Sequence, residues 1–186
     1  MHCSANVQEH DPTIRTMNET VMTDDHKPSF EHPVRLHKGE TAPNFELESD
    51  EYKHYALADF KHQNVVLYFY PQAMTSGCTI EANDFKANLE KFEKAGYTVI
   101  GISRDGVDKL QEFREKNGLN FILLSDPDYE VHKLYGTVKE TFEDGKKEYA
   151  VVRSTFVLDG EDKIVSAEYD VNPEGHVVDL LGKIAK

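Results

Sequence analysis

Hydrophobic residues are unevenly distributed along this chain of 186 residues. Residues 1 to about 40 are rich in His, Asp, Glu, Thr and Pro and show no apolar periodicity, which is typical of a segment that cannot bury a core. From Phe45 onward, short apolar runs alternate with amphipathic stretches. The pattern predicts a disordered or weakly ordered tail over residues 1–38 and a single α/β domain over residues 39–186.

The first strong element is the run Val65–Tyr70, which is apolar at every position and therefore predicts a central strand covered on both faces. A helix is predicted over Gly77–Lys94 because apolar residues recur there three or four positions apart. These residues are Ala82, Phe85, Leu89 and Phe92.

The alternation continues to the end of the chain. Further strands are predicted over Tyr97–Ser103 and Phe121–Leu124, and further helices over Val107–Asn117 and Val131–Leu134. A hairpin is predicted from Arg153–Leu158 and Ile164–Tyr169 about Asp159–Gly160, followed by a helix that Asn172–Pro173 opens and whose apolar side is Val177, Val178, Leu181 and Ile184. This order is expected of a thioredoxin-like fold of the α/β class, with a central mixed β-sheet flanked by helices.

Composition and charge narrow the range of functions. No apolar run approaches the roughly 20 residues of a membrane span, and no signal peptide opens the sequence, so we expect an intracellular, cytoplasmic protein. The formal net charge of −13 is repelled by phosphate and by anionic lipid, which disfavours nucleic-acid and membrane partners. Two cysteines, Cys3 and Cys78, cannot build a disulfide framework, which suits thiol chemistry better.

Cys78 is the strongest candidate for a chemical role. It stands in the first turn of a predicted helix directly after a predicted buried strand. Backbone N–H groups in a first turn have no partner within the helix, and the helix dipole favours negative charge there, so a thiolate is stabilised. The alternative is that Cys78 is a small buried hydrophobic residue, as a cysteine usually is.

The sequence around Cys78 resembles that of a known family. Residues 71–78, Pro-Gln-Ala-Met-Thr-Ser-Gly-Cys, match the Pro-x-x-x-Thr-x-x-Cys signature of peroxiredoxins, and the likeness continues through residues 79–82. Over about residues 38–186 the chain is similar to the bacterioferritin-comigratory (Q-type) class of the AhpC/TSA family. The segments that carry this likeness are Tyr68–Pro71, Gly96–Arg104, Gly118–Asp128 and Arg153–Leu158.

The resemblance implies a thiol peroxidase that needs no cofactor and reduces hydrogen peroxide and organic hydroperoxides. In such an enzyme, Cys78 attacks the peroxide as a thiolate and becomes a sulfenic acid. The resemblance also implies that Thr75 places its hydroxyl beside the sulfur and the peroxide, that Pro71 shapes and shields the pocket, and that Arg153 is a catalytic cation. Glu81 is implied as a supporting residue that orients the guanidinium.

Each of these roles has a simpler alternative. Thr75 has the position of an ordinary helix N-cap, and Pro71 that of a strand terminator. Arg153 is otherwise a solvated residue at a strand end. Glu81 is otherwise a first-turn acid that complements the helix dipole.

How the sulfenic acid is reduced is left open by the sequence. Many members of the class carry a resolving cysteine five residues after the reactive one, where this chain has Asn83. We expect a one-cysteine cycle in which thioredoxin, a glutaredoxin-like protein or a low-molecular-weight thiol reduces Cys78. The alternative is a two-cysteine cycle with Cys3 as resolving residue, since a flexible tail of this length spans roughly 30–35 Å. A start of translation at Met17 or Met22 would remove Cys3.

The sequence also bears on other functions. A thioredoxin-like dithiol reductase needs Cys-x-x-Cys, which Thr75 and Glu81 exclude. A peroxide sensor or holdase without rapid turnover stays open. No metal site is predicted, because the histidines of the tail match no ligand spacing; they are His2, His10, His26, His32 and His37. We expect a monomer or a weak homodimer.

Overall fold

The computed structural model describes residues 34–185. Residues 1–33, which include Cys3, and Lys186 lie outside the described residues, so the tail over residues 1–38 stays a prediction. The segment that leads into the domain is held at Leu36, whose N–H donates to the Tyr169 hydroxyl at 2.9 Å. None of the helices within residues 34–185 combines the length and the apolar character needed to cross a membrane.

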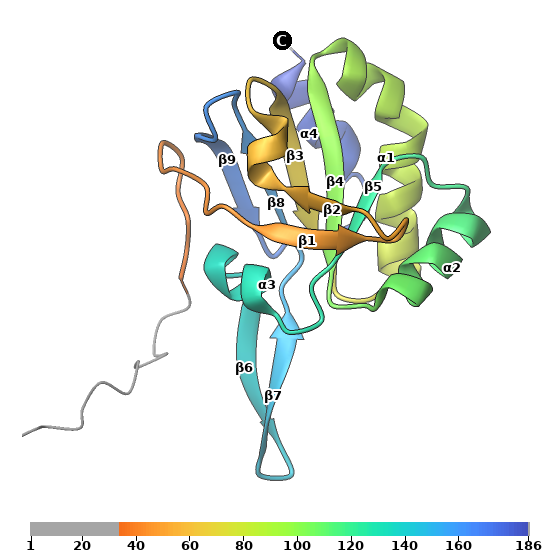
Figure 1. The fold of residues 1–186 in the computed structure, drawn as a ribbon, viewed down its shortest axis with the longest axis vertical. Helices are drawn as coiled ribbons and strands as arrows, with labels where there is room; N and C mark the ends of the chain where they lie inside the picture. The colour runs from red at the N-terminus through yellow and green to blue at the C-terminus, as the bar shows by residue number, and fades with distance from the viewer. Residues whose placement is uncertain (1–33, 186) are drawn as a thin grey trace, which may run out of the picture. The chain divides into compact units, whose positions relative to one another are not determined.

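Strands and helices alternate along the domain (Figure 1). The strands are β1 (Glu46–Ser49), β2 (His54–Ala56), β3 (Asn64–Phe69), β4 (Tyr97–Ser103), β5 (Ile122–Ser125), β6 (Val138–Glu143), β7 (Lys146–Val151), β8 (Ser154–Leu158) and β9 (Ile164–Tyr169). The helices are α1 (Ser76–Lys94), α2 (Val107–Asn117), α3 (Glu130–Tyr135) and α4 (His176–Ile184), and η1 (Leu57–Phe60) is a 3-10 helix. The predicted strands and the first three predicted helices are all present, with ends within one residue of those expected.

Seven strands form one sheet in the order β2-β1-β5-β4-β3-β8-β9. β4 is parallel to β3 and to β5, whereas the other neighbours are antiparallel, including the predicted hairpin of β8 and β9. This confirms the predicted central mixed sheet. Because β3 and β4 are parallel, the connections from β3 to α1 and from β4 to α2 both start at the same edge of the sheet.

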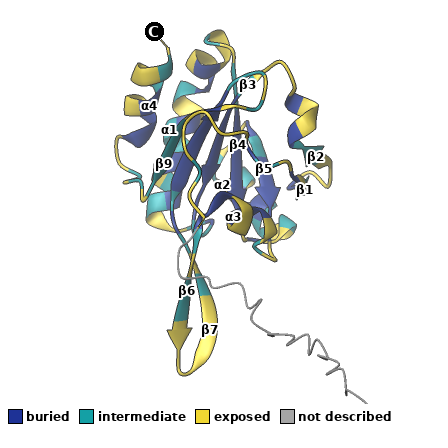
Figure 2. Cartoon of the chain, turned by 90° about the vertical axis from the view of Figure 1, so that its left-hand side faces the viewer, coloured by how far each residue is buried: buried dark blue, intermediate teal, exposed yellow. Residues whose placement is uncertain are grey.

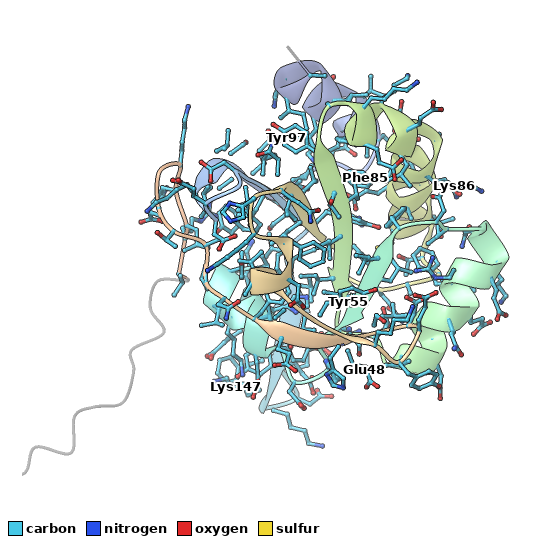
Figure 3. The ribbon with its side chains drawn as sticks, turned by 45° about the horizontal axis from the view of Figure 1, so that its top comes forward. Glu48, Tyr55, Phe85, Lys86, Tyr97 and Lys147 are labelled. Carbon is cyan, nitrogen blue, oxygen red and sulfur yellow. The ribbon has the colours of Figure 1, made fainter. Side chains whose placement is uncertain are left out.

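Two apolar cores cover the two faces of the sheet. Along β3, Val66 and Tyr68 face the core that α1, α2 and α4 complete, whereas Leu67 and Phe69 face the core that η1 and α3 complete. The central strands are accordingly buried (Figure 2). On α1, Phe85 is directed toward the sheet and is fully buried (Figure 3). Burial on both sides explains why β3 is apolar at nearly every position.

The last helix differs from the prediction. α4 begins at His176 rather than at Asn172–Pro173. The prediction that Val178 faces the core is wrong, because Val178 is 60% exposed while Val177 and Leu180 are buried. Residues 177, 180 and 181 share one side of the helix, and residue 178, turned about 100° from residue 177, points away from that side toward solvent.

A second, two-stranded sheet of β6 and β7 is not predicted by the hydrophobic pattern. Its strands are joined at Asp144 and Gly145, which have φ angles of 49° and 74°. Two consecutive left-handed residues are typical of a tight hairpin turn. Side chains along this ribbon are mostly exposed, including Phe142, so no alternation of buried and exposed positions marks it in the sequence.

Candidate active site

Cys78 lies in the first turn of α1, at the edge of the sheet where β3 ends. α1 begins at Ser76, and Thr75 before it has an extended backbone. The N–H groups of this turn have no acceptor within the helix, so the positive end of the helix dipole lies next to the thiol. Cys78 is only 1% exposed. The site therefore combines burial, which disfavours a charge, with a helix end that favours a negative one.

Arg153 brings a positive charge to this sulfur from 75 positions away in the sequence. Its Nη2 atom donates to Cys78 Sγ at 3.3 Å, and its side chain is 12% exposed. The sheet explains how they meet. Ser154, at the start of β8, pairs with Phe69, at the end of β3, so Arg153 lies level with the beginning of α1.

Glu81 contacts the same guanidinium through its other terminal nitrogen. It lies three residues after Cys78 on the buried side of α1, and Arg153 Nη1 donates to Glu81 Oε2. The side chain is 0% exposed, and Oε1 has no hydrogen-bond partner among the described residues. Burial raises the pKa of Glu81 to about 7, although the charge and the hydrogen bond of Arg153 act to lower it. Glu81 thus holds the guanidinium in position, although the negative charge of Glu81 is poorly compensated at this buried site.

The loop before α1 carries Pro71, which is half-buried, and Thr75, which is exposed. The Thr75 hydroxyl donates to the carbonyl of Gln72 at 2.8 Å and does not cap the helix. Within residues 34–185, no hydrogen bond joins this hydroxyl to Cys78. Since its hydrogen is used, the Thr75 oxygen offers lone pairs as an acceptor.

Asp105, which sequence reasoning missed, anchors this loop. Its carboxylate accepts hydrogen bonds from the Ala73 N–H at 2.6 Å and from Ser103 Oγ at 2.9 Å. Met74, which follows Ala73, has a φ of 72°, a conformation that a non-glycine residue keeps only with support from its surroundings. Asp105 follows β4 at the same edge of the sheet, 32 positions from Ala73, so no local sequence pattern indicates the contact.

Gly77 leaves the space in which the guanidinium lies. A Cβ atom at this position would stand 3.2 Å from Arg153 Nη2 and 3.3 Å from Pro173 Cγ. We expect Gly77→Ala to displace the guanidinium slightly and to slow the reaction with peroxide about threefold to tenfold, because preorganised sites are sensitive to small misplacements. Stopped-flow measurement with hydrogen peroxide checks this. Ser76→Ala at the neighbouring exposed position is the control, and equal rates for both variants and the wild type would contradict the steric role.

The structure therefore brings three of the candidate residues into one buried cluster, namely Cys78, Glu81 and Arg153. Thr75 and Pro71 lie in the loop that precedes this cluster. The remaining candidate, Cys3, lies outside the described residues.

Comparison with known proteins identifies the family. The sequence model of the AhpC/TSA family matches residues 38–167. A putative peroxiredoxin of Mycobacterium tuberculosis is 47% identical over 147 residues, which make up 79% of this chain and 94% of the relative. This chain belongs to the AhpC/TSA family. Peroxiredoxin Bcp of Escherichia coli is 40% identical over 141 residues, or 76% of this chain and 90% of the relative.

Solved structures of peroxiredoxins agree with this assignment. The bacterioferritin comigratory protein of Xanthomonas campestris is 33% identical with a TM-score of 0.73, over 83% of this chain and 100% of that one. A PrxQ mutant from Xylella fastidiosa is 32% identical with a TM-score of 0.75, over 81% of this chain and 96% of that one. The chain is a peroxiredoxin of the Bcp/PrxQ type, a thiol peroxidase that reduces peroxides, and the predicted thioredoxin-like fold is confirmed.

Proposed function

We propose that Cys78 is the nucleophile with which this peroxiredoxin reduces hydrogen peroxide and organic hydroperoxides. The proposal rests above all on the contact between Arg153 Nη2 and Cys78 Sγ at 3.3 Å. A buried thiol with only apolar neighbours resists ionisation. A guanidinium in contact with the sulfur, together with the N-terminal end of α1, favours the thiolate instead.

The reaction follows from these groups. The thiolate attacks the nearer oxygen of the hydroperoxide, the S–O bond forms as the O–O bond breaks, and the sulfur is oxidised to a sulfenic acid. The second oxygen leaves with the electron pair and takes a proton to become water or an alcohol. Arg153 and the backbone N–H of Cys78 stabilise the negative charge that moves onto this leaving oxygen.

Thr75 and Pro71 prepare the substrate for this attack. Because the Thr75 hydroxyl already donates to Gln72, its oxygen accepts the hydrogen of the incoming hydroperoxide and directs the substrate toward the sulfur. Pro71 has no N–H group, so it presents only its ring to the pocket and adds no competing donor. Organic hydroperoxides are included among the substrates because the Xanthomonas campestris relative is described as having alkyl peroxide reduction activity.

An external thiol completes the cycle. The position five residues after Cys78 is occupied by Asn83, so α1 supplies no second thiol there. The side-chain amide of Asn83 donates to the carbonyl of Thr79 at 2.9 Å. Thioredoxin, a glutaredoxin-like protein or a low-molecular-weight thiol would then reduce the sulfenic acid directly. The alternative is that Cys3 resolves it as an intramolecular disulfide.

Mass spectrometry after one equivalent of hydrogen peroxide separates the two cycles. We expect the full-length protein to gain one oxygen atom, because a sulfenic acid without a partner thiol keeps the oxygen that it received. A Cys3–Cys78 disulfide would instead appear as the loss of two hydrogen atoms, and would contradict the one-cysteine cycle. Steady-state peroxide consumption with an added thiol is the companion measurement, since a sensor or holdase would stop after one turnover.

A further inference from the structure

Two buried acids share the guanidinium of Arg153. Its Nη2 atom contacts Cys78 Sγ at 3.3 Å, and its Nη1 atom contacts Glu81 Oε2. Cys78 and Glu81 are 1% and 0% exposed, so bulk water solvates neither charge. Within residues 34–185, Arg153 is the one cation at ion-pair distance from Glu81. A single positive charge therefore faces two groups that can each become negative.

The titratable side chains around this cluster add no positive charge. Tyr68 and Tyr70 of β3 are fully buried, and burial raises the pKa of both hydroxyls, so they stay neutral. Asp84, on α1, acts to raise the pKa of Glu81. His176, at the start of α4, is buried, and burial lowers its pKa, so its ring is neutral at neutral pH.

The charge balance of the cluster leads to the inference. If the thiolate, the carboxylate and the guanidinium were all charged, one uncompensated negative charge would be buried, which is strongly unfavourable. If the two acids hold one proton between them, the cluster is neutral. We propose that Cys78 and Glu81 share a single proton in this way, so that Glu81 is a carboxylic acid whenever Cys78 is a thiolate. The inference rests on the proposed role of Cys78.

The shared proton supplies the proton that the leaving oxygen needs in the catalytic step. In the resting site the proton passes from the Cys78 thiol to the Glu81 carboxylate, which leaves a thiolate and a carboxylic acid. The thiolate then forms the S–O bond, the O–O bond breaks, and the leaving oxygen takes one proton. Since the sulfenic acid is neutral, Glu81 gives up its proton and becomes the carboxylate partner of Arg153. The cluster is neutral before and after oxidation, and solvent supplies no net proton.

Counting protons during the oxidation of Cys78 tests this inference. Hydrogen peroxide is added to the Cys3→Ser protein in weak buffer with a pH indicator, at a pH about one unit above the Glu81 pKa of about 7, so that Glu81 releases its proton once the thiolate is gone. This parent protein is expected to take up no proton per sulfenic acid formed. Glu81→Gln in the same background is expected to take up about one, because the thiolate is then the only acid and solvent must protonate the leaving oxygen. Asp84→Asn, which leaves the Arg153 contacts in place, is expected to behave as the parent does.

The outcomes separate this inference from the proposed function. Uptake of one proton by the parent, or of none by a Glu81→Gln protein whose thiolate absorbance is intact, overturns the sharing. If peroxide forms no sulfenic acid in the parent, the role of Cys78 itself is wrong. If Glu81→Gln does not fold, infrared spectroscopy of Cys78→Ser provides an independent measurement. Without the competing thiolate, the infrared band of a protonated Glu81 is expected to weaken near pH 7, and an unchanged band would also overturn the proposal.

Discussion

Replacing Cys78 with serine is expected to slow peroxide reduction by at least about a thousandfold, because loss of the nucleophile is among the most damaging changes that an enzyme can suffer. A serine hydroxyl is not ionised at neutral pH, and its oxygen cannot take the place of sulfur as the atom that is oxidised. Peroxide consumption in the presence of excess dithiothreitol measures this. A small dithiol regenerates the sulfur without a dedicated protein partner, so the assay reports on Cys78 alone.

Cys3→Ser is the matched control for this substitution. It removes the other thiol of the chain and leaves the contacts of Cys78 with Arg153 unchanged. We expect its first oxidation to proceed at the wild-type rate. Peroxide reduction that survives in Cys78→Ser, or a first oxidation that is lost in Cys3→Ser, would show that the nucleophile has been misassigned.

The burial of Cys78 restricts access to the site without excluding the chemistry. A sulfur that is 1% exposed and surrounded only by apolar groups would be inert packing. Here a guanidinium touches it, and the loop of residues 71–75 that precedes α1 is held at Ala73 by Asp105. Exclusion of water then strengthens the electrostatic effect of Arg153 on the reacting atoms.

The elements that the sequence predicts well are those that the two cores cover. β3 is buried on both faces, and α1 presents one apolar stripe, so their periodicities are visible in the sequence. β6 and β7 escape prediction because most of their side chains are exposed. β1 and β2 are also short and partly exposed, and β1 joins the rest of the sheet through pairing with a distant segment, as Ser49 does with Leu124.

The residues of the candidate site also differ in how well the sequence predicts them. The segment from Pro71 to Cys78 is a local motif and is found in the sequence directly. Arg153 is suggested by the family resemblance, but its contact with Cys78 depends on the register of β8 against β3. The roles of Gly77 and Asp105 are missed because both depend on tertiary contacts. Gly77 leaves space for the guanidinium, and Asp105 accepts a hydrogen bond from a loop N–H.

Removal of the Arg153 side chain is expected to slow the reaction with peroxide about a hundredfold. A charged hydrogen bond contributes about 1.5–3 kcal/mol, and a donor aimed at charge that develops in the transition state contributes about 10²–10³ in rate. The end of α1 supplies only about 0.3–1 kcal/mol, or up to about 2 kcal/mol when partly buried, so it cannot replace the guanidinium. Stopped-flow kinetics of Arg153→Ala with hydrogen peroxide measure the effect.

Two further variants test whether the loss of rate is specific to the position and shape of the Arg153 guanidinium. Arg104 also follows a strand at this edge of the sheet, but it donates to the Tyr129 hydroxyl at 3.0 Å, so we expect Arg104→Gln to keep the wild-type rate. Arg153→Lys keeps the charge but lacks the planar fork that contacts Cys78 and Glu81 together, so its rate is expected to fall between those of the wild type and Arg153→Ala. An Arg153→Ala rate within about tenfold of the wild type would contradict the electrostatic role, because even a charged hydrogen bond at the weak end of the usual range corresponds to about that factor.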